Sequence, residues 1–265
     1  MSPPRKKKKF GQHHLRDGSL CRPAVDYLQP LEGVGVVEIG PGGGVLTKQL
    51  LEGGAGSVLG LELDVEWAAE LESRAWPGLE LWVGDALDYD WSSVEARDRI
   101  AGNLPYNVAS PLMERILDRG AAGTRCAFLV QREMADRWCA VAGESDYGSF
   151  SVLMAARCIE RRRLSKVKAG SFDPPPKVES AFVGLELGPP TEEVVPWTLF
   201  KETVRAAFQQ RRKTVLNSLA STWGKEVARS LLDAASIDPG TRAERLVLAD
   251  FERLSFERAR LREVR

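Results

Sequence analysis

Four polar side chains stand at the ends of four short apolar runs, and their types suit the binding of a nucleoside. Glu38 lies in "VVEIGPGGGVLT", Glu62 in "SVLGLELD", Asp85 ends "LELWVGD" and Asn103 ends "RIAGN". Carboxylates accept hydrogen bonds from sugar hydroxyls and base amines, whereas an amide both donates and accepts. Because the carboxyl ends of parallel strands meet at one edge of a sheet, we expect these groups to share a cleft.

The glycine-rich turn indicates a ligand that carries adenosine. Gly40 and Gly42 follow Glu38 in an E-x-G-x-G-x-G pattern, which is neither a Walker loop nor the GxGxxG of dinucleotide sites. Glu62 stands 22 positions after Gly40, a spacing at which a carboxylate accepts both ribose hydroxyls. Asp85 is placed to accept a hydrogen bond from an adenine amine. The set favours S-adenosylmethionine over NAD or ATP; the alternative is a turn that only connects a strand and a helix.

The loop "NLPY" after the fourth apolar run has the parts needed to hold a planar base by its amino group. The amide oxygen of Asn103 and the carbonyl of Leu104 are two acceptors for the N–H bonds of an exocyclic amine. Pro105 stiffens the turn, and Tyr106 offers a ring on which a base can stack. The alternative is an ordinary Asn-Pro turn with a packed tyrosine.

Strand-like runs alternate with helix-like segments through the first two thirds of the chain. This alternation predicts βαβ units and a mostly parallel, doubly wound sheet. Two further neighbouring strands, joined by a loop, are expected to close the sheet without a helix between them. The predicted strands cover 34–40, 57–64, 79–85, 99–103, 126–131, 161–170 and 178–187, and the predicted helices cover 43–52, 65–75 and 110–118.

A proline-rich, acidic stretch over 188–197 predicts a linker. Behind it we expect helices only, because the segments 198–222, 224–235 and 242–261 contain no strand-like run. The prediction is an α/β domain over 1–188, which carries the chemistry, and a small all-α domain over 189–265.

Charge and cysteine content limit which binding partners and which cellular compartment we expect. The formal net charge of the 265 residues is zero, so only local basic clusters favour a polyanion. Such clusters lie within 5–16, within 157–168 and over 211–213. The four scattered cysteines match no zinc pattern, which suggests a reduced cytosolic protein without a metal. No apolar run is long enough to cross a bilayer, and we expect a cytoplasmic monomer.

Motifs in a fixed order along nearly the whole chain identify a resemblance. The sequence is similar to the ribosomal RNA adenine N6-dimethyltransferase family, and in particular to its bacterial small-subunit members. The resemblance implies a Rossmann-like class I methyltransferase sheet with a small all-α C-terminal domain, and S-adenosylmethionine as methyl donor. It rests on "KKFGQHHL", "VEIGPGGGVLT", "LELD", "GDAL", "GNLPYN", "YGSFSVL", "FDPPPKVESAF" and "AFQQRRKTVLNSL".

The resemblance also implies which residues form the site. The target would be two adjacent adenines in a hairpin loop near the 3′ end of 16S rRNA in the assembling small subunit. Cofactor contacts are expected from His13, Leu15, Glu38, Gly40, Gly42, Glu62, Leu63, Asp85, Ala86 and Asn103. Target-base contacts are expected from Asn103, Leu104, Pro105 and Tyr106, with Phe172 as a second aromatic wall. The three basic clusters, and not the resemblance, predict the RNA contacts: Lys7, Lys8, Arg161, Arg162, Arg211, Arg212 and Lys213, the last three on a basic helix.

Two departures and three alternatives accompany this prediction. His14 stands where the family usually has phenylalanine, and Ala243 where proline is more usual. A DNA adenine N6-methyltransferase would share the Asn-Leu-Pro-Tyr loop, and the 23S rRNA methyltransferases of the macrolide-resistance type share most of the catalytic domain. The segment "QQRRKTVLNSL" favours the small-subunit enzyme over both. A non-catalytic RNA-binding assembly factor is the third alternative, which the intact cofactor motifs disfavour.

Overall fold

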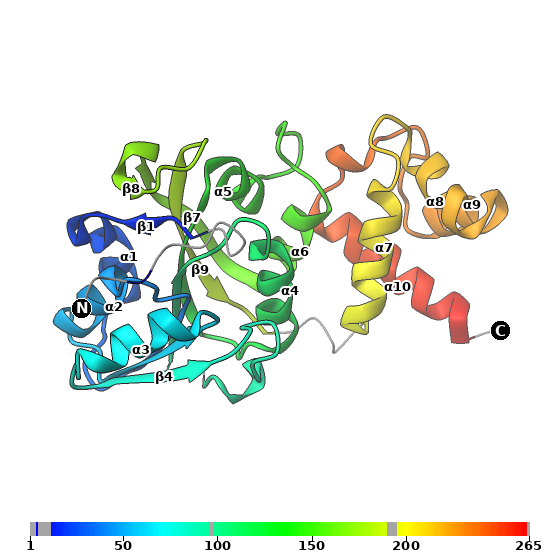
Figure 1. Cartoon of the computed structure of the whole chain (residues 1–265). Coiled ribbons are helices and arrows are strands. Elements are labelled where there is room, and N and C mark those ends of the chain that lie inside the picture. Colours follow the sequence, from blue (N-terminus) through cyan, green and yellow to red (C-terminus); the bar gives the residue numbers. More distant parts are fainter. Residues whose placement is uncertain (1–3, 5–11, 96–97, 190–194, 264–265) are drawn as a thin grey trace. The chain divides into compact units, whose positions relative to one another are not determined.

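The structure is a computed structural model that describes residues 4, 12–95, 98–189 and 195–263. The chain divides into two compact units, and Figure 1 shows the elements of each. The first unit comprises residues 1–135 and 160–188, and the second comprises 136–159 and 189–265. Residues 136–159, which the sequence-based boundaries put in the first domain, therefore belong to the unit that holds the C-terminal helices. Lys7 and Lys8 lie outside the described residues.

A seven-stranded sheet in the order β4-β3-β2-β5-β6-β9-β7 forms the centre of the first unit. The neighbours from β4 to β6 run parallel, and β9 runs antiparallel to β6. The predicted doubly wound α/β fold is therefore confirmed, as is the neighbouring pair β7 and β9. The strands are β2 (Gly35–Ile39), β3 (Ser57–Glu62), β4 (Leu79–Val83), β5 (Arg99–Asn103), β6 (Arg125–Gln131), β7 (Cys158–Val167) and β9 (Ser180–Leu187).

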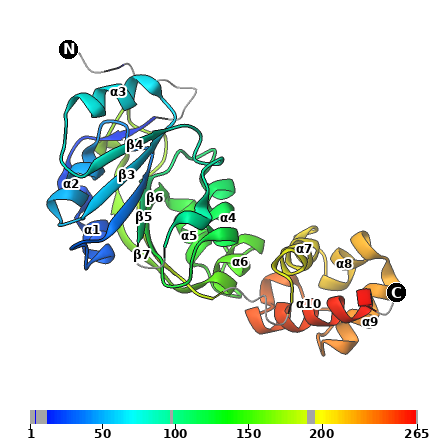
Figure 2. The same cartoon turned by 90° about the horizontal axis from the view of Figure 1, so that it is seen from below.

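Helices cover both faces of this sheet. Figure 2 shows α1 and α2 on one face and α4 on the other. Between α1, α2 and the sheet lies an apolar cluster that includes Leu28, Leu50 and Phe182, and its burial drives the layers together. The helices of this part are α1 (Arg22–Leu28), α2 (Val45–Glu52), α3 (Val65–Ser73), α4 (Ala109–Arg119) and the start of α5 (Arg132–Cys139), whose residues 136–139 belong to the second unit. Short 3-10 turns cover Gly18–Cys21, Trp91–Ser93 and Ala169–Ser171.

A second, two-stranded sheet joins distant parts of the chain. In β1 (His14–Leu15) and β8 (Phe172–Asp173), His14 pairs with Asp173 and Leu15 with Phe172 in antiparallel register. Arg16 extends the pairing, because its backbone N–H donates to Ser171 O (3.0 Å) and its Nε to Phe172 O (3.1 Å). The sheet joins the described part of the N-terminal arm, residues 12–16, to the "FDPPP" segment. The sequence-based prediction did not include this contact.

The second unit is helical, as predicted for its C-terminal part. Tyr147 joins the segment 136–159 to the C-terminal helices, because its hydroxyl donates to Leu246 O (2.9 Å). Among these helices, Phe208 stacks on Phe251 with ring centroids 5.7 Å apart. The helices are α6 (Ser149–Arg157), α7 (Trp197–Phe208), α8 (Val215–Trp223), α9 (Lys225–Ala234) and α10 (Leu248–Glu263), with a 3-10 turn over Ala243–Arg245. Ala243 is buried at the start of that turn.

The continuous helical stretch expected over 198–222 is wrong in one respect. A turn separates α7 from α8, and Thr214 begins α8 as its N-cap by accepting from the N–H of Asn217 (3.4 Å). An N-cap residue has non-helical backbone angles, so the chain has to leave the helix before it. Arg211, Arg212 and Lys213 consequently lie in the turn and not on a helix.

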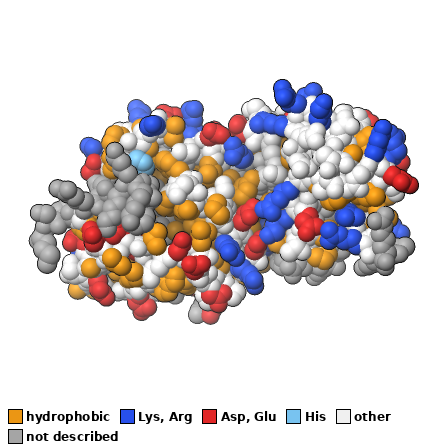
Figure 3. Space-filling model, turned by 45° about the vertical axis from the view of Figure 1, so that its right-hand side comes forward, with side chains coloured by type: hydrophobic (Ala, Val, Ile, Leu, Met, Phe, Trp, Pro, Cys, Tyr) orange, Lys and Arg blue, Asp and Glu red, His pale blue; other side chains and the backbone are white. Residues whose placement is uncertain are grey.

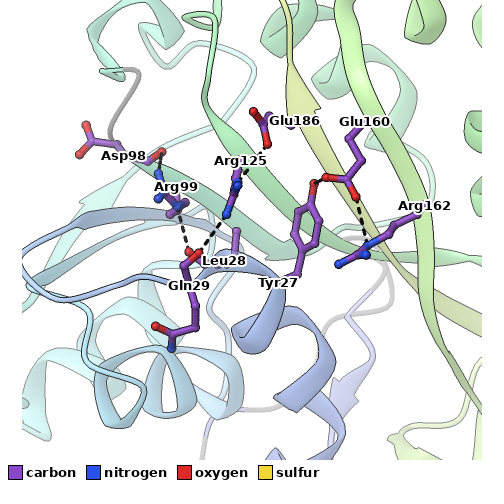
Figure 4. A network of polar contacts seen from close by, with 9 residues as sticks. All are labelled: Tyr27, Leu28, Gln29, Asp98, Arg99, Arg125, Glu160, Arg162 and Glu186. Atoms are coloured by element: carbon purple, nitrogen blue, oxygen red, sulfur yellow. Dashed lines mark hydrogen bonds and ion pairs between the residues drawn. The ribbon is translucent and has the colours of Figure 1, made fainter.

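Two arginines at the start of neighbouring strands fix the end of α1. Arg99 and Arg125 face each other in register on β5 and β6, and Figure 4 shows their side chains beside the backbone that ends α1. Nε of Arg99 donates to Leu28 O (2.9 Å), and Nη1 of Arg125 donates to Gln29 O (3.0 Å). Because the last carbonyls of a helix have no partner inside it, these bonds hold α1 against the sheet.

We predict that Arg99→Met lowers the free energy of unfolding by about 1–3 kcal/mol, because Leu28 O loses a buried charged donor. Urea unfolding measures this change. Lys48→Ala is the control, since the Lys48 side chain forms an exposed ion pair with Glu52 (3.7 Å), and this substitution should cost less than about 0.5 kcal/mol. Equal losses in the two variants would contradict the assigned role of Arg99.

Candidate active site

Three of the four polar residues predicted to share a cleft, Glu62, Asp85 and Asn103, line one cavity at one edge of the sheet, whereas the fourth, Glu38, does not line it. Gly40, Glu62 and Asn103 stand at the carboxyl ends of β2, β3 and β5, and Asp85 follows β4. Gly40 lines the same cavity, which has a volume of about 300 Å³. Its other residues include the predicted His13, Gly42, Leu63, Ala86, Leu104, Pro105 and Tyr106, together with Gln12, His14, Gly84, Leu87, Asn107 and Val108, which were not predicted.

The glycine loop has a backbone conformation that residues with a side chain rarely adopt. Gly40 and Gly42 have φ of +64° and +49°, the left-handed region that glycine adopts without strain. A Cβ on Gly42 would also lie 2.9 Å from the ring of His14. The loop is held from behind by Arg74, whose Nη1 donates to Gly43 O (2.9 Å). These contacts fix the path of the loop along the cavity.

Glu62 is a buried carboxylate held by backbone donors. Its Oε2 accepts from the N–H of Gly42 (2.9 Å), and its Oε1 accepts from the N–H of Asp64 (2.9 Å). Burial raises the pKa of Glu62 above its ordinary value, and the two backbone hydrogen bonds oppose that shift. A carboxylate offers about four lone-pair sites, so both oxygens can still accept hydroxyl groups from the cavity.

Glu38 lies deeper, beside the same loop. It lines a small adjoining cavity of about 30 Å³ together with Leu15, Gly40 and Asn103. The side chain is fully buried, and its Oε2 has no hydrogen-bond partner in the part of the chain that the structure describes. Burial, with a smaller contribution from the Glu62 charge, raises the pKa of Glu38 to about 8. A cation bound next to it would relieve this unfavourable burial.

Asn103 is oriented by the N-terminal arm. Its Nδ2 donates to the backbone carbonyl of His13 at 2.7 Å. Because a carbonyl can only accept, this bond identifies the amide nitrogen and leaves Oδ1 as the acceptor of the side chain. Next to it, Leu104 continues the strand pairing by donating its N–H to Leu129 O (3.0 Å). Asn103 Oδ1 is thus left as an acceptor, and the neighbouring Leu104, which lines the same cavity, has a backbone carbonyl as a second acceptor.

Tyr106 forms part of the cavity wall beside these acceptors. Its hydroxyl lies 2.9 Å from Oγ of the buried Ser180, so the phenol is hydrogen-bonded at its far end. Burial raises its pKa, while the hydrogen bond to Ser180 opposes the shift. Its ring faces the ring of His13, with centroids 5.8 Å apart and planes inclined by 21°. Tyr106 is thus a neutral, oriented aromatic surface.

The N-terminal arm is fixed over the cavity by polar contacts on both sides. Gln12 donates to Oδ2 of Asp64 (3.2 Å), and Nδ1 of His13 bonds to Pro174 O (2.7 Å). His14, the departure from the family pattern, packs edge-on against Trp67 with centroids 4.6 Å apart. An imidazole at position 14 therefore still packs the arm against the glycine loop. Gln12 was missed although it lies inside the motif "KKFGQHHL".

The opposite end of the cavity offers an apolar surface and a carboxylate. Leu63 is 47% exposed, which is unusual for a leucine at the end of a strand and suits contact with a flat apolar ligand. Asp85 is exposed, and its Oδ1 accepts from the N–H of Leu87 (2.9 Å). Leu63, Asp85 and Ala86 border the same cavity. This arrangement matches the predicted adenine end of the site.

Phe172 does not lie where we expected it. Its side chain is fully buried in the apolar cluster that also contains Leu15 and Phe182. Among the described residues it is absent from the lining of the cavity. The reason is the pairing of β8 with β1, in which Phe172 stands opposite the buried Leu15. In this structure Phe172 supports the arm from below and forms no wall.

The predicted RNA-contacting residues that the structure describes lie on two surfaces. On β7, Arg162 is exposed, lies over the ring of Tyr27 (5.0 Å) and pairs with Glu160 (3.3 Å), as Figure 4 shows; Arg161 is half-buried on the same strand. In the second unit, the exposed turn contains Arg211, Arg212 and Lys213. Figure 3 shows Lys and Arg side chains gathered at several places on that unit. The cavity contains none of these residues.

The donor set fits S-adenosylmethionine. Glu62 would offer acceptors for ribose hydroxyls, and Leu63 and Asp85 would offer a surface and an acceptor for adenine. Glu38, in the adjoining small cavity, and Glu62 are buried, and a cation bound next to their carboxyl groups would favour the ionised form. Within the described residues no group of three or more potential metal ligands is present. Likewise, no described helix is long and apolar enough to span a membrane. The fold and the cavity together define an S-adenosylmethionine-dependent methyltransferase of the Rossmann-like class.

Comparison with known proteins narrows this class. A family model described as "Ribosomal RNA adenine dimethylase" matches residues 4–259, and the chain belongs to this family. It is 41% identical over 253 residues to ribosomal RNA small subunit methyltransferase A of Thiobacillus denitrificans, covering 94% of this chain and 96% of that protein. The protein of the same name from Pseudomonas aeruginosa is 36% identical over 262 residues, covering 97% and 96%.

Solved structures show the same fold. A dimethyladenosine transferase from Plasmodium falciparum aligns with a TM-score of 0.79 at 24% identity, covering 94% of this chain and 98% of that one. A 23S rRNA methyltransferase aligns with a TM-score of 0.67 at 23% identity, covering 92% and 98%. These likenesses establish the fold along nearly the whole chain.

The buried Glu38 predicts a pH dependence of stability in the cofactor-free protein. The folded state retains this proton up to a pH of about 8, whereas the unfolded chain releases it near 4.5. The folded state thus binds more protons between these values, and this contribution to stability is lost as the pH rises from 4.5 through 8. Glu38→Gln lacks the titrating group, so its free energy of unfolding relative to the parent should increase across that window by up to a few kcal/mol.

Urea unfolding at a series of pH values measures this difference. Glu72→Gln, which alters an exposed carboxylate, serves as the control and should follow the parent at every pH. Parallel curves for the parent and Glu38→Gln would contradict the prediction.

Proposed function

We propose that the protein transfers methyl groups from S-adenosylmethionine to N6 of two adjacent adenines in a 3′-terminal hairpin loop of 16S rRNA. The product is N6,N6-dimethyladenosine in the assembling small ribosomal subunit. Membership of the adenine dimethylase family supports the chemistry, and the names of the relatives support the small subunit. The observation that carries the proposal is the pair of acceptors, Asn103 Oδ1 and Leu104 O, beside Tyr106 in the cavity that also contains Glu62.

The acceptors address the main chemical difficulty of the reaction. The exocyclic amine of adenine is a poor nucleophile because its lone pair is delocalised into the ring. Hydrogen bonds from the amine to Asn103 Oδ1 and Leu104 O favour a more pyramidal and more reactive nitrogen. The cofactor supplies an activated methyl group, and the chain supplies orientation and preorganised dipoles. No strong base is needed, because the nitrogen becomes acidic once it is alkylated.

The target adenine has to leave its stack to reach these acceptors. Extrusion of a base costs a few kcal/mol, and stacking on the ring of Tyr106 offsets part of this cost. After the first transfer one N–H is gone, so one of the two acceptors has to tolerate a methyl group nearby.

The RNA contacts and the cellular setting complete the proposal. The basic turn over 211–213 and Arg161 and Arg162 on β7 are proposed to bind RNA backbone beyond the target base. We further propose that the protein acts as a monomer in the cytoplasm, where ribosomal subunits assemble and where its scattered cysteines stay reduced. The 23S rRNA methyltransferase likeness keeps that activity as the second candidate, because it covers 92% of the chain.

We predict that Tyr106→Ala retains its affinity for S-adenosylmethionine but loses about 10- to 100-fold in methyl transfer, since base stacking contributes about 1–3 kcal/mol. Isothermal calorimetry and single-turnover methylation measure the two quantities. Tyr106→Phe, which keeps the ring and removes only the bond to Ser180, should retain most of the rate. Asn103→Ala should weaken both quantities. Full activity of Tyr106→Ala would show that the ring only packs.

The substrate is tested by mass spectrometry of small-subunit RNA after incubation with protein and isotopically labelled cofactor. We expect two labelled dimethyladenosines, on partly assembled subunits in preference to a short naked hairpin. Replacing Arg211, Arg212 and Lys213 with alanine should weaken subunit binding and flatten its salt dependence, because phosphate contacts release counterions. Cofactor affinity should not change.

Charge-conserving changes at the same three positions provide the control and should bind subunits like the parent. Parental methylation by the alanine variant, or equal methylation of duplex DNA and RNA, would overturn the substrate assignment. Labelled 23S RNA in place of 16S RNA would favour the second candidate.

A further inference from the structure

Asp64 is a buried carboxylate two positions after Glu62, and both its backbone and its side chain have fixed partners. It is only 2% exposed. Its N–H donates to Oε1 of Glu62 (2.9 Å), and its carbonyl accepts from the N–H of Ala68 (3.0 Å). Oδ1 accepts from the N–H of Glu66 (3.1 Å), and Oδ2 accepts from Nε2 of Gln12 (3.2 Å). Asp64 therefore contacts the cofactor end of the site, the helix α3 and the N-terminal arm.

The start of α3 explains only one of the two carboxylate oxygens. An N-cap side chain accepts a backbone N–H from the first turn of its helix, and Oδ1 does this at Glu66. An asparagine caps a helix as well as an aspartate does, so the cap alone does not require a carboxylate. The second oxygen, Oδ2, binds a segment that lies 52 positions earlier in the chain. Asp64 thus joins the arm to the bend that follows β3.

The arm contacts both of the residues that hold Glu62. The carboxylate of Glu62 accepts from the N–H groups of Gly42 and Asp64, each at 2.9 Å. Gln12 binds Asp64. The ring of His14 lies so close to Gly42 that a Cβ on that glycine would be 2.9 Å from it. The position of Glu62 in the cavity is therefore linked to the position of the arm at two points.

The described part of the arm belongs to the small sheet of β1 and β8 and not to the large sheet. We propose that Asp64 is a positioning residue that couples the arm to Glu62, so that binding of S-adenosylmethionine and docking of the arm strengthen each other. A ligand that binds the docked form more tightly shifts the chain toward that form, and such a coupling is reciprocal. The inference goes beyond the proposed function, because it concerns the cofactor and the arm and involves no RNA.

The polarity of the contact provides a test. A carboxylate can only accept, so the side-chain amide of Gln12 presents its nitrogen to Asp64. Gln12→Glu places a second carboxylate at this short distance, where like charges repel. Adding Asp64→Asn returns a donor to the pair, because the new amide nitrogen at position 64 can donate to the new carboxylate at position 12. The new amide oxygen can still cap α3.

Calorimetry with the full chain measures the affinity for S-adenosylmethionine. We expect Gln12→Glu to lower it about tenfold, within the usual range for coupled sites, and the double variant to recover most of this loss. The recovery distinguishes coupling from a direct contact between Gln12 and the cofactor, which Asp64→Asn would not restore. Glu72→Gln is the matched control, since it removes an exposed carboxylate from the same helix, and it should bind like the parent.

Hydrogen exchange over residues 12–16 measures the reciprocal effect. Saturating S-adenosylmethionine should slow exchange of the parent arm by about tenfold, because a reciprocal coupling acts by the same factor on both events. In Gln12→Glu the slowing should fall below about twofold although the site is filled, and in the double variant it should return. Thermal melting shows whether each variant is folded. If the double variant is not, Gln12→Ala keeps the test, because it alters only the arm and should also abolish the slowing.

The inference is wrong if Gln12→Glu changes neither affinity nor exchange, or only one of them. It is equally wrong if the folded double variant recovers neither quantity, if Gln12→Ala retains the slowing, or if Glu72→Gln shows the same losses. None of these measurements contains RNA, so their failure leaves the proposed methylation of the small subunit untouched. Absence of subunit methylation by the parent would instead refute the proposed function. The two failures are therefore distinguishable.

Discussion

The hydrogen bond from Asn103 to the backbone of His13 is the contact on which the catalytic end of the site depends. At 2.7 Å it decides which atom of the Asn103 amide faces the cavity, and an amide with its nitrogen turned inward would present a donor to an amine that is itself a donor. The bond needs the N-terminal arm in place, and the arm is placed by β1 and β8. A pair of two-residue strands, whose Leu15 and Phe172 are buried in the apolar cluster, thus helps to orient the amide of Asn103.

Electrostatics impose a second constraint, at the cofactor end. Glu38 and Glu62 are both buried, and burial raises the pKa of each, for Glu38 to about 8. Two neighbouring buried carboxyl groups are unfavourable when both are ionised. Their burial therefore lowers the stability of the cofactor-free protein. A positively charged ligand bound beside these carboxyl groups would reduce this penalty.

Much of the fold and of the cofactor end could be predicted from the sequence, because β2, β3, β4 and β5 are short, mostly apolar runs, and a polar residue stands in or directly after each of them. The same logic placed Glu62, Asp85 and Asn103 at one edge. It failed where order depends on distant pairing: β1 and β8 are two residues long, too short for any periodicity. The burial of Phe172 follows from that pairing, and one aromatic residue beside prolines carries no directional signal. The break before Thr214 was missed because the helical pattern resumes directly after it.

The cavity alone cannot decide which RNA is modified. The 23S rRNA methyltransferase shares the fold over 92% of this chain. A pocket that accepts one extruded adenine does not contact the neighbouring nucleotides and so cannot distinguish one RNA sequence from another. Discrimination therefore has to come from surfaces that contact the RNA beyond the target base. The exposed basic residues around Arg162 on β7 and on the turn over 211–213 are the surfaces proposed for this role. Because the turn belongs to the second unit, the proposal places part of the RNA selectivity outside the unit that holds the cavity.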